Sequence, residues 1–163
     1  MTALNIGSFR PRAQGGMVLL VSLVFLLLLT MIGISSMQNA TMQEKMAGNV
    51  KLRNESFQVA EAALRIGENA VALSAYALDT CSGVNGCAPP SAAEYNSITS
   101  AGVGSPSGIA WIAAGAGFYG VQKIGTTANP VNSTCSSATL YRITGIGLSG
   151  SSRSVLESIY AKC

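Results

Sequence analysis

The strongest constraint on this chain is an uncharged run of thirty-one residues, from 13 to 43. Within it, residues 17–37 read MVLLVSLVFLLLLTMIGISSM, in which only three serines and one threonine are polar. At a rise of about 1.5 Å per residue, this segment spans roughly 30 Å, the thickness of one bilayer core. The sequence therefore predicts a transmembrane helix, which we place at residues 17–40.

Two basic residues, Arg10 and Arg12, lie just before the apolar run, and the next charged residue is Glu44. Because positive charge beside a membrane helix favours the cytoplasmic side, the N-terminus is expected in the cytoplasm. The chain after about residue 40 is then outside the membrane, in the periplasm if the cell is Gram-negative. We therefore expect a single-pass inner-membrane protein with a periplasmic head.

Three kinds of N-terminal segment fit this hydropathy. A cleaved secretory signal is disfavoured, because its apolar core has only about 7–15 residues and a small-residue cleavage site follows it, whereas SSMQNATMQEKM follows the run here. A plain signal anchor explains the hydropathy equally well. The third kind is the type IV prepilin layout, in which a short basic leader and a glycine precede an apolar helix, and Gly15 and Gly16 stand at that place.

Residues 44–78 contain no proline and are rich in Ala, Glu, Lys, Arg, Leu and Met, which are strong helix formers. Apolar side chains recur at spacings of three, four or seven, which predicts one amphipathic stripe. The members of this stripe are Met42, Met46, Val50, Phe57, Ala60, Leu64 and Val71. No turn cluster separates the segment from the apolar run, so we expect one helix from about residue 17 to 78. Its half from 41 to 78 is expected to pack on the C-terminal domain.

The composition changes after residue 78. Residues 79–163 hold twelve of the eighteen glycines, four of the five prolines and all four cysteines. Residues 79–107 are expected to form a loop. Alternating β-branched and aromatic residues bounded by Gly and Ser predict strands, at 109–112, 118–124, 140–146 and 154–160, with a hairpin connection at 148–152. The predicted fold class is α+β, one long N-terminal helix packed on a small antiparallel sheet of three or four strands.

Four cysteines in an exported domain indicate disulfides, and three pairings are possible. Proximity in the sequence favours Cys81 with Cys87 and Cys135 with Cys163. A zinc site is disfavoured, because the C-x5-C spacing is unusual for zinc and the chain has no histidine. The sequence also lacks the C-x-x-C motif of redox proteins.

The composition offers little catalytic chemistry. The missing histidine removes the commonest general base. Charged residues make up only 10% of the chain, and the basic ones are scattered at a net charge of +3, unlike the clustered charge of a nucleic-acid-binding surface. We therefore expect no enzyme, no catalytic residue, no cofactor, no metal and no nucleic-acid partner.

Residues 14–68 resemble the N-terminal region of PilX-type minor pilins of type IV pili. The resemblance rests on blocks that helical periodicity alone does not require. These are QGG at 14–16, LLLLT at 26–30, TMQEKMAGN at 41–49 and AEAALR at 60–65. They cover about a third of the chain, and the fold implied is type IV pilin-like.

The resemblance implies that residues 1–16 are a leader, which prepilin peptidase cleaves after Gly16, and that the new terminus, Met17, is N-methylated. Most pilins carry a glutamate at the fifth residue after cleavage, where this chain has Val21. The family function is to help initiate pilus assembly at or near the tip, supporting adhesion and twitching motility. The implied partners are other minor pilins and the major pilin through the N-terminal helix, a PilY-type tip adhesin, and the inner-membrane assembly platform. After assembly the protein would lie in the extracellular fibre.

Two other functions fit the same architecture. A minor pseudopilin of a type II secretion system has the same anchor, although the block at 42–49 favours the pilus. A simple membrane-anchored periplasmic binding module would have no leader processing at all.

Overall fold

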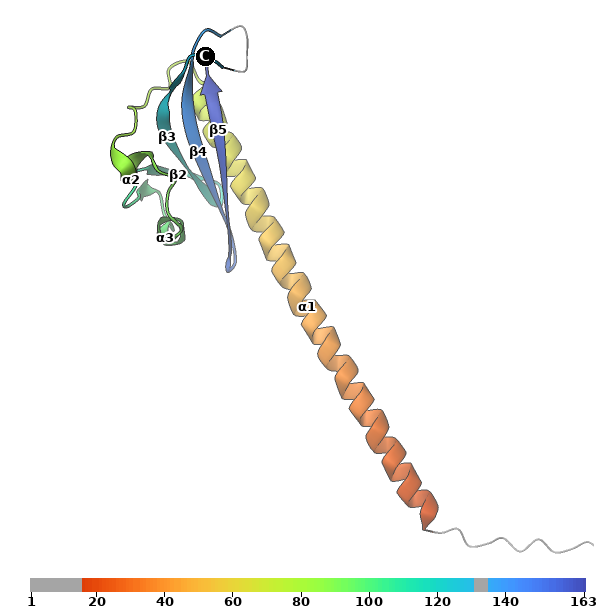
Figure 1. Cartoon of the computed structure of the whole chain (residues 1–163). Coiled ribbons are helices and arrows are strands. Elements are labelled where there is room, and N and C mark those ends of the chain that lie inside the picture. Colours follow the sequence, from red (N-terminus) through yellow and green to blue (C-terminus); the bar gives the residue numbers. More distant parts are fainter. Residues whose placement is uncertain (1–15, 131–134) are drawn as a thin grey trace, which may run out of the picture. The chain divides into compact units, whose positions relative to one another are not determined.

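The computed structural model describes residues 16–130 and 135–163 (Figure 1). Its elements are α1 (Met17–Ala72), α2 (Gly83–Cys87), α3 (Ala92–Ser97), β1 (Gly102–Val103), β2 (Ala110–Ala114), β3 (Gly117–Thr127), β4 (Ala138–Ser149) and β5 (Ser152–Lys162). The chain divides into two compact units, and the boundary falls inside α1, between Met46 and Ala47. The predicted α+β class, with one long N-terminal helix and an antiparallel sheet, is confirmed.

The helix ends at Ala72, six residues before the predicted end. The next backbone bonds span three residues, from the Leu73 amide to the Ala70 carbonyl (3.3 Å) and from the Tyr76 amide to the Leu73 carbonyl (3.0 Å). Lys162 at the end of β5 donates to the Leu73 carbonyl (2.5 Å) and the Tyr76 carbonyl (3.4 Å). Lys162 thus adds a second bond to the Leu73 carbonyl and also bonds the Tyr76 carbonyl. It places a cation just beyond the C-terminal end of the helix, where the helix dipole favours positive charge. This contact links residues 89 positions apart, so the local sequence could not predict where the helix ends.

The five strands form one antiparallel sheet in the order β1-β2-β3-β4-β5. The four predicted strands are present, and β3, β4 and β5 are longer than predicted. The hairpin between β4 and β5 pairs Ser149 with Ser152 across a two-residue loop. Gly150 begins that loop with φ +54°, a conformation that the tight hairpin requires and that glycine adopts without strain.

The prediction of a loop at 79–107 is wrong in part, because this segment contains α2, α3 and β1. The Ser91 side chain caps α3 by accepting a hydrogen bond from the Glu94 amide (3.3 Å). Helices of five or six residues give too few turns for a periodic pattern to appear in the sequence. In Figure 1, α2 and α3 lie on the other side of the sheet from α1. Both faces of the sheet are therefore covered, and the unit has three layers instead of the two expected.

The face of α1 that packs on the sheet consists of small residues. Its buried residues are Ser56, Ala60, Ala63, Gly67 and Val71. Two strand glycines face it: a Cβ at Gly145 would lie 2.5 Å from the Ala60 carbonyl oxygen, and one at Gly147 would overlap the Ser56 carbonyl oxygen. Helix and strand backbones are therefore in direct contact. Large side chains on this face would hold the two apart.

The predicted amphipathic stripe is therefore only partly correct. Ala60 and Val71 are buried and Leu64 is half-buried, whereas the larger members are exposed: Met42 (60%), Met46 (60%), Val50 (57%) and Phe57 (48%). The large apolar residues of the core come from the sheet and from the segment before it. They form one cluster around Tyr119, Tyr141 and Ile143, and another around Trp111, Phe118 and Ile146.

Replacing Gly147 with alanine tests the backbone contact. The new methyl group would meet the carbonyl of Ser56 and the amide of Ala60, which no side-chain rotation relieves. We expect Gly147→Ala to lower the free energy of unfolding by about 3 kcal/mol or more. Gly48→Ala is the control, because Gly48 lies in the helix with no atom near its would-be Cβ, and this change should stabilise by about 0.5–1 kcal/mol. Urea unfolding of the two variants in detergent, followed by circular dichroism, gives both values, and equal stability would contradict the close contact.

Candidate functional site

The unit before residue 47 consists, in its described part, of one exposed helical segment. Every side chain from 17 to 46 is exposed, including Leu20 (63%), Phe25 (63%) and Leu29 (66%). Across the described residues, α1 is the one helix that is long and apolar enough to cross a membrane. A helical segment that is apolar on all sides and exposed along its whole length needs lipid or other helices to cover it.

Three of the four hydroxyl groups between residues 17 and 37 donate to the helix itself. Ser22 donates to the Leu19 carbonyl (2.9 Å), and Thr30 donates to the Leu27 carbonyl (2.8 Å). Ser35 donates in the same way to the carbonyl one turn earlier (3.0 Å). Because these donors are already bonded, placing them in an apolar medium carries little of the cost of an unpaired polar group. The polar interruptions are therefore compatible with a membrane-spanning helix.

The structure describes some of the residues expected to matter for processing and leaves one of them out. Gly15 lies outside the described residues. Gly16 is exposed and directly precedes the helix, and Met17 is the first helical residue, with 74% of its surface exposed. Val21 lies about one turn further along α1 and is 45% exposed. Gly16 and Met17 are thus the junction at which α1 begins.

The four cysteines form the two disulfides that proximity in the sequence favours. Cys81 joins Cys87, with Cα atoms 5.1 Å apart, and closes a short loop around α2. Cys135 joins Cys163, with Cα atoms 5.8 Å apart, and ties the end of β5 to the segment before β4. All four thiols are therefore used in structural cross-links.

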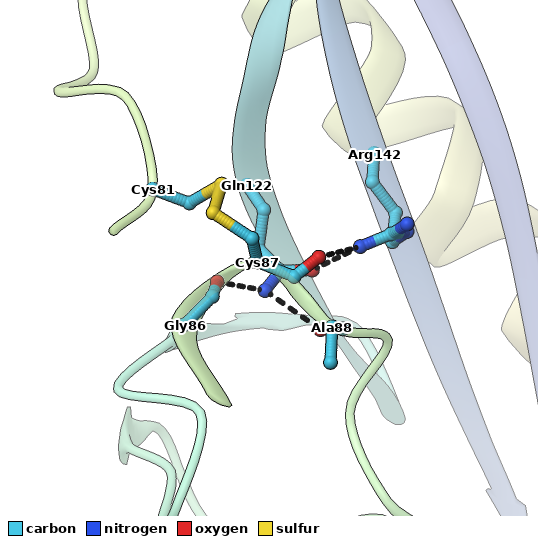
Figure 2. Close-up of a disulfide and its surroundings, with 6 residues drawn as sticks. All are labelled: Cys81, Gly86, Cys87, Ala88, Gln122 and Arg142. Atoms are coloured by element: carbon cyan, nitrogen blue, oxygen red, sulfur yellow. Dashed lines mark hydrogen bonds between the residues drawn. A yellow bond between two sulfur atoms is a disulfide. The ribbon is translucent and has the colours of Figure 1, made fainter. Parts of the chain in front are cut away.

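Two polar side chains from the sheet fix the Cys81–Cys87 loop in place, as Figure 2 shows. Gln122 on β3 is buried, and its amide nitrogen donates to the carbonyls of Gly86 (2.5 Å) and Ala88 (3.1 Å). Arg142 on β4 donates to the Cys87 carbonyl (2.7 Å) and to the Gln122 side-chain oxygen (3.2 Å). Three consecutive carbonyls of the loop thus bond to the sheet, and Arg142 also pairs with Glu157 on β5 (3.2 Å).

A buried carboxylate performs the same task for α3. Glu94 is 1% exposed and accepts hydrogen bonds from Trp111 Nε1 (3.2 Å), Ser107 Oγ (2.5 Å) and the Ser107 amide (3.3 Å). Its side chain thereby holds α3 to the segment that leads into β2. Sequence reasoning missed Glu94, Gln122 and Arg142, because their partners lie 13 to 55 residues away in the chain. For Gln122 and Arg142 the available signal was a polar side chain inside an otherwise apolar strand.

Tyr76 follows the end of α1 and packs edge-on against Tyr141, with ring centroids 5.9 Å apart. Burial raises the pKa of Tyr76 above its usual value, and the neighbouring Tyr119 and Tyr141 add to the shift. Burial likewise raises the pKa of Tyr95, with a further contribution from Glu157. Both rings are half-buried against the core, where ionisation is disfavoured.

Comparison with known proteins finds one family. Residues 15–65 match the model of the family described as PilX N-terminal. The match spans about a third of the chain and includes the apolar half of α1, the Gly16–Met17 junction and the start of the helix face that packs on the sheet. No curated protein and no solved structure matches the chain.

The half-buried Tyr76 and Tyr95 predict a stability that depends on pH in alkaline solution. Because the folded-state pKa of Tyr76 is raised, the unfolded chain loses this proton first, so stability is full below pH of about 10 and falls as the pH rises further. We expect Tyr76→Phe to change stability by less than about 1 kcal/mol at pH 7 and to make the alkaline decline shallower. Urea unfolding at several pH values from 7 to 11 measures both, and parallel declines in the two proteins would contradict the assignment. Tyr95 should leave a residual decline in the variant.

Proposed function

We propose that the protein is a minor pilin of a type IV pilus, because residues 15–65 match the PilX N-terminal family. The observation that carries the proposal is the exposed apolar half of α1, which begins at the Gly16–Met17 junction and lies within the family match. A pilin requires such a segment twice, first as a membrane anchor and then as a packing surface inside the fibre. The role is structural and not catalytic.

Processing prepares the helix for assembly. Prepilin peptidase removes residues 1–16 on the cytoplasmic side, and Met17 becomes a methylated N-terminus. The position of Gly16 directly before the first helical residue supports this step, since the cut leaves the helix whole. The leader takes Arg10 and Arg12 with it, and the rest of the chain carries eight basic and seven acidic residues. The mature subunit is therefore close to neutral.

Assembly follows from the apolar surface. Once the helix leaves the lipid, its side chains must be covered by the helices of other subunits, because exposing them to water costs roughly 25 cal/mol per Å². Small residues such as Ser22, Gly33 and Ser35 allow helices to approach closely in such a bundle. The partners are other minor pilins and the major pilin, gathered on the inner-membrane assembly platform. The head after residue 78 faces the periplasm before assembly and the outside afterwards.

Val21 supports a low-copy role at or near the tip. In major pilins the glutamate at this position is thought to pair with the terminal amine of the neighbouring subunit, and a carboxylate at membrane depth is normally partnered and functional. Valine offers no such contact, so this subunit docks without it. We propose that it primes assembly together with other minor pilins and a PilY-type adhesin, and so supports adhesion and twitching motility.

The first test is the intact mass of the protein purified from its native membrane. We expect a chain that lacks residues 1–16 and carries one added methyl group. Reduction should add four hydrogen atoms, because the described cysteines form two disulfides. A strain without prepilin peptidase is the control and should yield the full-length mass. Full-length protein in the presence of active peptidase would contradict the pilin function and favour a plain membrane-anchored module.

A second test concerns copy number. Val21→Glu restores the carboxylate that bulk subunits use, so we expect several-fold more copies of this protein in each sheared pilus. Val21→Gln is the matched control, because glutamine has the size of glutamate without its charge. This change should leave the copy number unchanged. Quantitative mass spectrometry of purified pili measures both. An unchanged copy number for Val21→Glu would show that the missing carboxylate does not limit incorporation.

A further inference from the structure

The outer edge of β5 is a long and regular strand edge. β5 pairs with β4 along all eleven of its residues without a register shift and ends the order of strands in the sheet. Ser149 and Ser152 flank a two-residue hairpin loop and therefore exchange backbone hydrogen bonds. The alternation that follows directs the backbone N–H and C=O groups of residues 153, 155, 157, 159 and 161 away from β4. Among the described residues, no strand pairs with these groups.

The usual devices that protect an edge strand are missing from β5. It contains no proline and no bulge. Its charged side chains bind to other parts of the head: Arg153 donates to the carbonyls of Tyr95 and Ile98, and Glu157 pairs with Arg142. Lys162 binds the end of α1. No charge of this strand is therefore left to repel an approaching chain.

A groove of about 400 Å³ runs beside this edge, between β5 and α1. It is lined by the consecutive residues 153–156 of β5 and by Arg53, Asn54 and Phe57 of α1. Consecutive residues, which alternate between the two faces of β5, line the groove, which places it along the strand edge and not over one face. Phe57 is 48% exposed there, and Arg53 is exposed and forms no ion pair within the described part of the chain. The groove thus offers one apolar surface and one unpaired cation.

We propose that an extended segment of a second protein adds to the β5 edge as a sixth strand. Its backbone pairs with the outward-facing groups of β5. The side chains on its α1-facing side enter the groove, where a carboxylate pairs with Arg53 and an apolar residue packs on Phe57. Strand addition to a free edge supplies backbone hydrogen bonds for affinity, and the groove supplies the selection among sequences.

A second copy of this chain does not fit the groove as well. Glu157 is the one acidic residue of β5, and it is already paired with Arg142. The matching edge of another copy therefore brings no free carboxylate to Arg53. A different protein with an acidic residue in an extended segment can pair with the free backbone groups of β5 and also with Arg53.

The test uses the full-length protein in detergent and a labelled peptide with the sequence Thr-Leu-Thr-Glu-Thr-Leu-Thr. The leucines and the glutamate of this peptide share one face in the extended state. We expect saturable binding, measured by fluorescence anisotropy against empty micelles. Arg53→Glu should weaken binding at least tenfold, because it places like charges together. Val155→Pro should do the same, because it removes an outward N–H without touching the β4 ladder.

Each change has a matched control. Lys51→Glu makes the same charge change two residues away on another side of α1, and Val155→Thr keeps the backbone N–H. Both should bind within twofold of the unaltered protein. Changing the glutamate of the peptide to lysine, or methylating alternate backbone nitrogens of the peptide, should each abolish binding. If the Val155→Pro variant fails to form its disulfides and so does not fold, the methylated peptide still tests whether binding depends on backbone hydrogen bonds.

Three results would overturn the proposal. The first is the absence of saturable binding. The second is binding that does not respond to Arg53→Glu or to methylation of the peptide backbone. The third is sedimentation of the unaltered protein as a dimer that Val155→Pro dissociates, since a second copy would then occupy the edge. None of these measurements depends on pilus assembly, so the proposed function stands or fails separately.

Discussion

The direct contact between the backbone of α1 and the backbone of β4 determines the rest of the head. Gly145 and Gly147 lack the side chains that would separate strand from helix, and Ala60 and Gly67 are the matching small residues of α1. Ser56 lies at the same contact and binds Ser152 (3.1 Å) and Ser154 (2.7 Å) on β5. Because this surface is so narrow, the large apolar side chains of the helix lie outside it. The volume of the core comes from the sheet and from the segment that covers its other face.

That second face is closed by a segment with little core of its own, and hydrogen bonds hold it there. Short helices and turns expose backbone carbonyls, which must find partners once they are buried. Gln122 and Arg142 bind the carbonyls around Cys87, while Arg153 binds those at the end of α3. Glu94 completes the set from within α3. Each cover segment is thus bonded to the sheet by a polar side chain as well as packed against it.

The sequence was sufficient for those features that local patterns determine. The apolar helix, the four main strands and the nearest-neighbour cysteine pairs all depend on residues close together in the chain. The packed face of α1 could not be predicted, because Ala63 and Gly67 are unremarkable until Tyr119 and Ile143 lie opposite. Glycines in β4 would ordinarily indicate a weak strand, and here they permit the direct contact between the backbones of α1 and β4. The cover layer depended on partners dozens of residues away.

The placement of charge connects the head to its proposed role. Most charged side chains after residue 90 have partners within their own unit. Glu94, Arg142, Arg153 and Glu157 contact other head residues, and Lys162 contacts Leu73 just after α1. The surface left for neighbours is therefore mostly uncharged, which suits a subunit surrounded by others, since removing water from a charge on assembly is costly unless a partner compensates. Arg53 on α1 lies outside that set and differs from it, because it is exposed and forms no ion pair among the described residues. Because Arg53 lies beside a free strand edge, a partner that brings one carboxylate there would gain affinity from a single ion pair.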